Sequence, residues 1–519
     1  MRRLTGRIPA VAWACALVAL ANGVAWSLIL PPFQVPDENA HYAYVQQVAE
    51  RGTLPRHAAV EGPFSPREDQ MLGALLTYGI EGHRANPSPD TQVQQQVIDA
   101  IAKQKLSARG SGDALTATSN PPLYYALQAV PYKLAGGKVL DKLAAMRLLS
   151  ALMGAVTVLL VFLFLRELLP GSRWAWPAGA LVAAFQPMFG FMSSGVNNDD
   201  LLYLTAAGVL WALARAFRRG LTPANGALIG GFLGAGLISK LTLLGFVPAV
   251  AVGVALLLRR AWPVGGLLGG PVGQPVTAGG GAGRDDRRVA TRGAGLTLDR
   301  RTALRGAGWA LGLSLAPWVL YVILNHFVWA RSAIPGGVGG VPAAAGRKFN
   351  FHEEVSHVWQ LFLPRLWLRP QFGYFPLWET WFKGFVGRFG WLDYDFPAWV
   401  YRVALAVSAL VVALAVAELA RGREALRGRL DELAVYSLAV LGLCVEIGVE
   451  SYRYLILGSG VFEQARYLLP LLCLYGAIVA LAVRFGGRRW GPVLGVGIVV
   501  LAIGHDLFAQ AITIARYYA

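Results

Sequence analysis

Residues 8–44, IPAVAWACALVALANGVAWSLILPPFQVPDENAHYAY, decide the fold class. Residues 8–30 form an apolar run without a charged side chain, and about 20 such residues are needed to cross the hydrocarbon core of a bilayer. The run is longer than the hydrophobic part of a signal peptide and lacks a clear cleavage site, so we interpret it as the first transmembrane span. Two adjacent carboxylates, Asp37 and Glu38, follow where the chain leaves the membrane.

The composition of the whole chain agrees with a membrane protein. Of its 519 residues, 55% are hydrophobic and only 15% are charged, which is too apolar for a soluble globular protein of this size. We expect an all-α polytopic membrane protein that forms one domain over residues 1–519, with a turn between two spans at Lys240. The eleven predicted spans lie near residues 8–30, 144–166, 174–192, 200–217, 222–239, 241–258, 307–329, 399–419, 432–449, 465–484 and 490–512.

The distribution of basic residues predicts the orientation. The net charge of +17 could indicate a nucleic-acid partner, but 24 of the 47 Lys and Arg residues lie in six short segments that share one side of the membrane. These segments are 1–7, 166–173, 215–219, 259–305, 421–429 and 484–489. Because cytoplasmic loops carry the excess of positive charge, this pattern predicts a cytoplasmic N-terminus and no nucleic-acid partner.

Two long outer loops result, at residues 31–143 and 330–398, while the Gly-rich stretch 259–305 reads as a flexible cytoplasmic linker. In the first loop, residues 37–52 have a helical pattern of apolar side chains that stops at Gly52, so we expect an amphipathic helix on the outer leaflet. The second loop has 17 aromatic residues between Phe349 and Trp399, and we expect it to rest on the membrane surface.

The adjacent carboxylates allow three interpretations. Asp37 could simply cap the following helix, with Glu38 favoured by the helix dipole. A cap needs only one carboxylate, however, and an acid at the bilayer boundary could instead take a proton from an acceptor hydroxyl as a general base. Asp37, Glu38 and His41 are also spaced so that they could share a divalent cation. No other cofactor is indicated.

Other outer segments carry polar side chains that could bind a sugar or a phosphate. Asn198 and Asp199, in SSGVNNDDLLYL at 193–204, could be turn residues, could bind sugar hydroxyls or could hold a cation with Asp37. Asn120 and Tyr124 could position the chain or line a lipid or sugar site. Four basic residues could bind a phosphate or could be anchors at helix ends: Lys240, Arg388, Arg453 and Arg466.

Six segments together resemble a known family. VPDENAHYAY, NPPLYYAL, GVNNDDLLY, ISKLTLL, FVGRFGWLDYDFP and QARYLLPLL occur in this order between residue 31 and about residue 472. They resemble the successive motifs of the bacterial membrane proteins grouped as domain of unknown function 2142, which is related to the GT-C glycosyltransferases. The chain departs from the expected pattern at two places: in the residues that follow His41, and in the residue before Arg466, which is usually Gly. Neither change removes a charged group.

The resemblance implies a multi-pass enzyme of the bacterial inner membrane that moves a sugar from a polyprenyl-phosphate carrier to an extracytoplasmic glycan, lipid or protein. It implies that one of Asp37 and Glu38 is the catalytic base. The later family positions correspond to Asn198, Asp199, Lys240, Arg388, Asp393, Arg466 and Tyr467.

We therefore expect an inverting GT-C glycosyltransferase in which Asp37 is the base and Arg466, Lys240 and Arg388 stabilise the phosphate leaving group. The alternatives are a transporter or flippase of lipid-linked sugars and a polymerase or ligase that uses a polyprenyl-diphosphate donor. A cytoplasmic nucleotide-sugar enzyme would have to use RDDRR at 284–288, which lies in the predicted linker.

Overall fold

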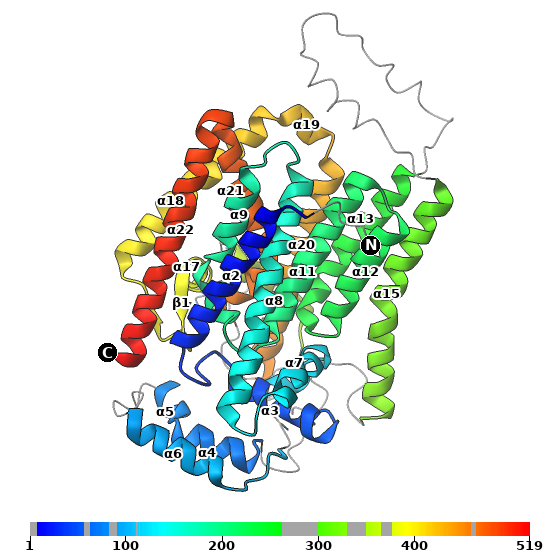
Figure 1. Cartoon of the computed structure of the whole chain (residues 1–519). Helices are drawn as coiled ribbons and strands as arrows, with labels where there is room; N and C mark the ends of the chain where they lie inside the picture. Colours follow the sequence, from blue (N-terminus) through cyan, green and yellow to red (C-terminus); the bar gives the residue numbers. More distant parts are fainter. Residues whose placement is uncertain are drawn as a thin grey trace, which may run out of the picture.

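The computed structural model describes residues 8–56, 63–81, 91–110, 113, 115–261, 299–329, 349–364, 376–457 and 463–519. Most of the predicted linker, including RDDRR, and parts of the second outer loop lie outside these residues. The described chain forms a bundle of long helices with a smaller helical lobe at one end (Figure 1). The C-terminal end of α13 and the N-terminal end of α15 lie at the opposite end of the bundle (Figure 1).

Nine helices among the described residues are long and apolar enough to cross a membrane. They are α2 (Ala10–Ile29), α8 (Val139–Leu168), α11 (Asp199–Arg219), η2 with α13 (Leu241–Phe246 and Val247–Arg260), α15 (Arg300–Phe327), α18 (Ala398–Arg421), α20 (Leu430–Leu457), η6 with α21 (Ala465–Leu471 and Leu472–Phe485) and α22 (Gly487–Tyr518). The expectation of an all-α polytopic membrane protein is confirmed.

The remaining two predicted spans correspond to shorter helices, so the count of eleven stays a prediction. One is α9 (Ala175–Ala184), which α10 (Pro187–Met192) follows, and the other is α12 (Pro223–Leu237). The chain leaves α12 and begins η2 around Lys240, in agreement with the predicted turn between two helices.

The contact between α12 and α15 depends on glycine. A Cβ atom added to Gly226 would lie 1.9 Å from the carbonyl oxygen of Gly306, and one added to Gly230 would lie 2.4 Å from that of Ala310. The two helix backbones therefore touch, as small residues allow in membrane helices.

The lobe consists of α3 (Glu38–Arg51), α4 (Pro66–Ala74), α5 (Thr77–Glu81), α6 (Thr91–Lys103), η1 (Thr116–Ser119) and α7 (Leu123–Leu134). The predicted helix after the first span is thus present as α3, and it ends at Gly52 in the left-handed conformation (φ 68°). Its predicted place on the membrane surface is wrong. Residues 38–47 are all buried, and α7 packs along this helix: the ring of Tyr125 stacks on that of Tyr44 at 3.6 Å, and the Tyr132 hydroxyl accepts a hydrogen bond from Gln46 at 3.2 Å.

The second outer segment is also more enclosed than predicted. It contains α16 (Phe351–Phe362), the π-helical turn η5 (Trp378–Lys383), α17 (Gly384–Gly387) and a hairpin of β1 (Arg388–Phe389) and β2 (Tyr394–Asp395), and α19 (Arg423–Arg427) follows further along the chain. In the antiparallel hairpin, Arg388 pairs with Asp395 and Phe389 with Tyr394. Phe389 is buried against Trp26 and Phe191, so part of the aromatic segment packs into the bundle instead of lying on a surface.

Candidate active site

The backbone at Asp37 explains why its side chain is available for chemistry. Asp37 occupies the N-cap position of α3 with φ 62° and ψ 10°, a left-handed conformation that few residues other than glycine adopt, and its side chain caps no backbone N–H. Oδ1 accepts a hydrogen bond from Thr116 Oγ1 at 3.1 Å, and Oδ2 accepts one from Arg466 Nη2 at 3.2 Å. The interpretation of the Asp37 carboxylate as a helix cap is therefore wrong.

Arg466 lies between two carboxylates. Its guanidinium group contacts Asp37 on one side, and its Nε atom lies 3.8 Å from Asp199 Oδ2 on the other. The side chain is 6% exposed, and within the described part of the chain its Nε and Nη1 atoms donate no hydrogen bond. The Tyr203 hydroxyl donates to the Arg466 carbonyl at 3.3 Å, which fixes the backbone at the start of η6.

Lys240 completes this group of charges. Its Nζ atom lies 2.5 Å from Asp199 Oδ1 and 5.6 Å from the centre of the Tyr467 ring. Asp199 is fully buried at the first residue of α11, where the helix dipole favours a negative charge. Asp37, Asp199, Lys240, Arg466 and Tyr467, which are far apart along the chain, thus meet at one place.

Two asparagines explain how the sequence holds this arrangement. Asn197 Nδ2 donates to the carbonyl of Pro36 at 3.1 Å, next to Asp37. Asn198 Nδ2 donates to the carbonyl of Ser239 at 3.3 Å, next to Lys240. The loop before α11 therefore ties the segment that carries the acid to the one that carries the lysine, and Asn198 has a positioning role in this structure.

Electrostatics keep Asp37 ionised and His41 neutral. Burial by itself raises the pKa of Asp37, but the charge of Arg466 and the hydrogen bonds from Arg466 and Thr116 outweigh it and hold the pKa below its ordinary value. Burial lowers the pKa of His41 to about 4, although the charge of Asp37 opposes the shift. His41 Nδ1 lies 2.9 Å from the hydroxyl of Tyr125, so the neutral ring belongs to the packing of α3 against α7.

Glu38 faces away from this site. Its carboxylate forms two hydrogen bonds with Arg147, at 2.6 and 2.8 Å, and also accepts one from the backbone N–H of Val196 at 3.0 Å. Arg147 in turn donates to the carbonyls of Ser27, Leu30 and Pro31. Both side chains are buried, so the pair fastens the exit of α2 to α8, and the geometry favours Asp37 over Glu38 as the base.

The other predicted site residues have different surroundings. Asp393 is in an ion pair with Arg516 at 3.1 Å, and Arg453 pairs with Glu450 at 3.1 Å on an exposed part of α20. Tyr124 is buried, with its hydroxyl 3.1 Å from Ser150 Oγ, and Asn120 Nδ2 donates to the carbonyl of Ala117. The structure does not bring these four residues to the group around Arg466.

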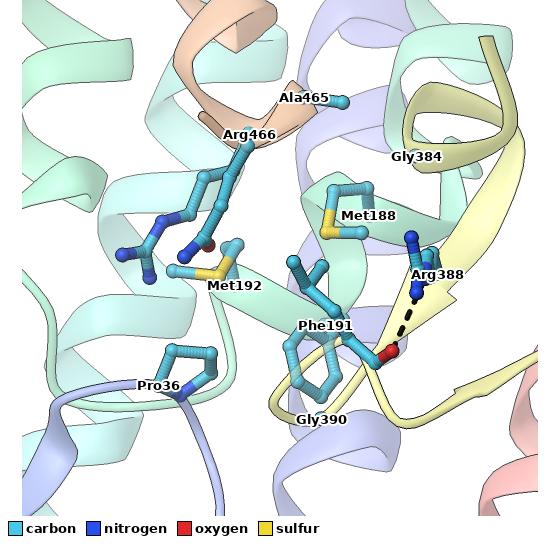
Figure 2. Close-up of a pocket in the computed structure, with 11 residues that line it drawn as sticks. Pro36, Met188, Phe191, Met192, Gly384, Arg388, Gly390, Ala465 and Arg466 are labelled. Carbon is cyan, nitrogen blue, oxygen red and sulfur yellow. Dashed lines mark hydrogen bonds between the residues drawn. The ribbon is translucent and has the colours of Figure 1, made fainter. Parts of the chain in front are cut away.

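A small cleft opens beside Arg466. Its lining includes Pro36, Met188, Phe191, Met192, Arg388 and Arg466. Figure 2 shows Arg466 and Arg388 on opposite sides of the cleft, with Met188 and Met192 between them. Arg388 Nε donates to the carbonyl of Leu392 at 3.1 Å, and in the described part of the chain Arg388 forms no ion pair. The predicted group of cations thus consists of Arg466 and Lys240, with Arg388 across the cleft.

The described residues contain no group of three His, Cys, Asp or Glu side chains that could hold a metal ion. Glu38 is committed to Arg147 and His41 to Tyr125, so the geometry gives no support to the trio of Asp37, Glu38 and His41 as ligands. A divalent cation stays a prediction.

A comparison with known protein families identifies the family of this chain. The family described as predicted membrane protein (DUF2142) matches residues 20–475, which contain all five of the charged and aromatic residues that meet at Arg466. The chain belongs to this family. The search of curated proteins found no match to this chain.

Two solved structures resemble this family member in fold. An oligosaccharyltransferase from Archaeoglobus fulgidus in the apo form is 12% identical with a TM-score of 0.42, and the match covers 98% of this chain and 56% of that one. The Pmt1-Pmt2 protein O-mannosyltransferase complex of S. cerevisiae, bound to the sugar donor, is 16% identical with a TM-score of 0.33. The match covers 60% of this chain and 33% of that one. This chain therefore spans about half and a third of the lengths of the two chains it matches.

Sequence reasoning missed several residues in and around this site. Arg147 interrupts an apolar run at the start of a span, and a charge inside a span is a signal that could have drawn attention to it. Thr116 on η1 and Glu81 on α5, whose carboxylate lies near Asp37, have no sequence pattern that marks them.

Proposed function

We propose that this protein is an inverting glycosyltransferase that moves a sugar from a polyprenyl-phosphate donor to an acceptor on the extracytoplasmic side of the bacterial inner membrane. The observation that carries the proposal is the contact between a carboxylate free of any capping role, Asp37, and a buried arginine with unused N–H groups, Arg466.

In the reaction, an acceptor hydroxyl attacks the anomeric carbon of the donor sugar. The hydroxyl oxygen forms a bond to that carbon, the bond from carbon to the phosphate oxygen breaks and its electron pair stays on the phosphate, and the proton passes to Asp37. Such proton transfer by a positioned base is typically worth about 100- to 10,000-fold in rate. A single displacement of this kind inverts the configuration at the carbon.

The cations around Asp37 suit a phosphate leaving group. Arg466 has Nε and Nη1 unused within the described residues, and Lys240 stands beside Asp199 with 16% of its side chain exposed. Preorganised cations stabilise charge that develops on a leaving group. When a phosphate takes up part of the charge of Arg466, the pKa of Asp37 is less depressed, so the carboxylate becomes a better base when the donor is bound.

An apolar groove supports a lipid-borne donor. The groove has a volume of about 260 Å³ and an entirely apolar surface, and it begins two residues after Arg466. Its lining comes from α17, α20, η6 and α21: Phe385, Val440, Leu468, Leu469, Leu471, Leu472, Leu474, Tyr475 and Ile478. A prenyl chain in this groove would lie against η6, the element that also carries Arg466.

The test uses purified protein in proteoliposomes with synthetic polyprenyl-phosphate sugars, and it follows the release of polyprenyl phosphate. We expect Asp37→Asn to lower turnover by about 100-fold or more while donor binding is kept. Asp141→Asn, which alters an exposed acid in the first turn of α8, is the matched control and should turn over normally. Normal turnover by Asp37→Asn would contradict the proposal.

The same variant separates this reaction from its rivals. A transporter of lipid-linked sugars needs no base, and a diphosphate-dependent polymerase relies on arginines more than on a carboxylate. In either case Asp37→Asn should keep most of its activity and Arg466→Ala should lose it.

A further inference from the structure

Helix α5 is fastened against the corner of the lobe that holds Asp37. The carbonyl of Thr77 accepts a hydrogen bond from Gln34 at 3.4 Å, and the hydroxyl of Tyr78 accepts one from Asn39 at 3.4 Å. Gln34 and Asn39 flank Asp37 in the sequence, so this five-residue helix is positioned by the same segment that carries the proposed base.

The tip of the hairpin joins α5 through the last turn of α22. Arg516 donates to the carbonyl of Ile80 at 3.0 Å and pairs with Asp393 at 3.1 Å. Asp393 in turn accepts a hydrogen bond from the backbone N–H of Trp391 at 2.9 Å. Arg516 therefore holds α5 and the hairpin tip together, and the tip residues Gly390 and Leu392 on either side of Trp391 line the cleft of Figure 2.

Glu81 ends α5 near both Asp37 and Trp391. Burial, followed by the charge of Asp37, raises the pKa of Glu81 to about 7, while a hydrogen bond from the Trp391 side chain works in the opposite direction. Its Oε1 atom is buried and has no hydrogen-bond partner among the described residues. The proposed transfer reaction makes no use of this carboxylate.

Two aromatic rings stand beside it with free surface. Tyr78 is 54% exposed and Trp391 is 39% exposed, whereas the side chain of Asp37 is 22% exposed. Besides burial, the charge of Glu81 raises the pKa of Tyr78, and the charge of Asp37 raises the pKa of Glu81. Two partly exposed rings and one acid thus lie at the helix that Gln34 and Asn39 tie to the segment of Asp37.

We propose that Tyr78, Glu81 and Trp391 form a binding site for a carbohydrate acceptor and deliver one of its hydroxyls to Asp37. The inference rests on the proposed function and names the acceptor class. The negative face of an aromatic ring attracts the weakly positive C–H groups of a sugar ring. A carboxylate oxygen accepts hydrogen bonds from sugar hydroxyls, and leaving such a buried oxygen unpaired is costly. An acceptor without hydroxyl groups would leave Glu81 Oε1 without a hydrogen-bond partner among the described residues.

The test measures binding of the purified full-length protein to an array of defined oligosaccharides. We expect the wild type to bind, and we expect Trp391→Ala and Glu81→Gln each to weaken binding about tenfold, the loss of one aromatic contact or one hydrogen bond to a charged group. Trp391→Phe should keep most of the affinity. Trp399→Ala is the matched control, because Trp399 is 58% exposed at the start of α18 and stacks on Phe508.

Binding of polyprenyl phosphate, measured on the same preparations, separates this inference from the proposed function. Both variants should bind it as the wild type does. If no oligosaccharide binds, or if Trp391→Ala binds like the wild type, the carbohydrate site is refuted while donor binding still stands. Equal loss of polyprenyl phosphate binding in Trp391→Ala would also refute it, because the tip would then be a structural element. Transfer to a peptide or a lipid that neither substitution affects is a further contradicting result.

Discussion

Asp37 and Glu38 are neighbours in the sequence and have different surroundings because α3 begins between them. Asp37 stands outside the helix in a left-handed conformation and faces Arg466, whereas Glu38 is the first helical residue and points to Arg147. The sequence indicated that a helix cap needs only one of the two acids. It could not show which acid faced the site, because the choice depends on one backbone torsion and on a partner on α8.

Matched amide substitutions of the two acids should have opposite effects. Asp37→Asn should fold normally and fail to turn over. Glu38→Gln leaves the buried Arg147 without its counter-charge, and loss of one partner of a buried pair costs about 3–5 kcal/mol. Thermal unfolding of the two purified variants checks the difference. If Glu38→Gln unfolds at the wild-type temperature and loses only turnover, the structural assignment of Glu38 is wrong.

His41 predicts a pH dependence of stability. Its pKa is about 4 in the folded protein and 6.5 ordinarily, so the unfolded chain binds more protons between these values. The stability that the neutral ring contributes is present above about pH 6.5 and is lost as the pH falls toward 4. Melting temperatures of the wild type should therefore fall over this range more steeply than those of His41→Gln. Parallel curves for the two proteins would show that His41 is not responsible.

At the scale of elements, hydropathy located the long helices well because crossing a bilayer demands a run of apolar residues. It failed for α3, whose polar positions are covered by tyrosines of α7, since periodicity records one helix and not its neighbours. The hairpin was also missed. Its strands have two residues each, and its anchor is the burial of Phe389 in the bundle, which no local pattern reveals.

The contact of α12 with α15 gives a sharp test with an internal control. Gly226→Ala places a Cβ atom 1.9 Å from the Gly306 carbonyl, so the helices must separate, and overpacking of this kind costs about 1–3 kcal/mol or more. Gly231→Ala on the same helix meets nothing within 4 Å and should be neutral or stabilising by up to about 1 kcal/mol. Thermal unfolding compares them, and equal effects would contradict the observed packing.

At the scale of the whole molecule, the candidate site is a product of topology. Asp37 and Arg466 are 429 positions apart, and Lys240 meets Asp199 from another pair of helices. The sequence suggested which charges belong together through their position on the predicted outer side and through the resemblance to a family. It could not separate Asp393 and Arg453 from the group, because their partners, Arg516 and Glu450, are set by packing.

The proposed reaction requires that one acid and two cations from distant parts of the chain share a pocket for a lipid-borne phosphate. A cryo-electron microscopy map of the protein with bound polyprenyl phosphate tests it most directly. We expect phosphate density within hydrogen-bonding distance of Arg466 and Lys240, the prenyl chain in the groove that includes Leu468 and Ile478, and the Asp37 carboxylate turned to the phosphate-bearing cleft. Phosphate density away from Arg466, or an Asp37 side chain turned away from that cleft, would contradict it.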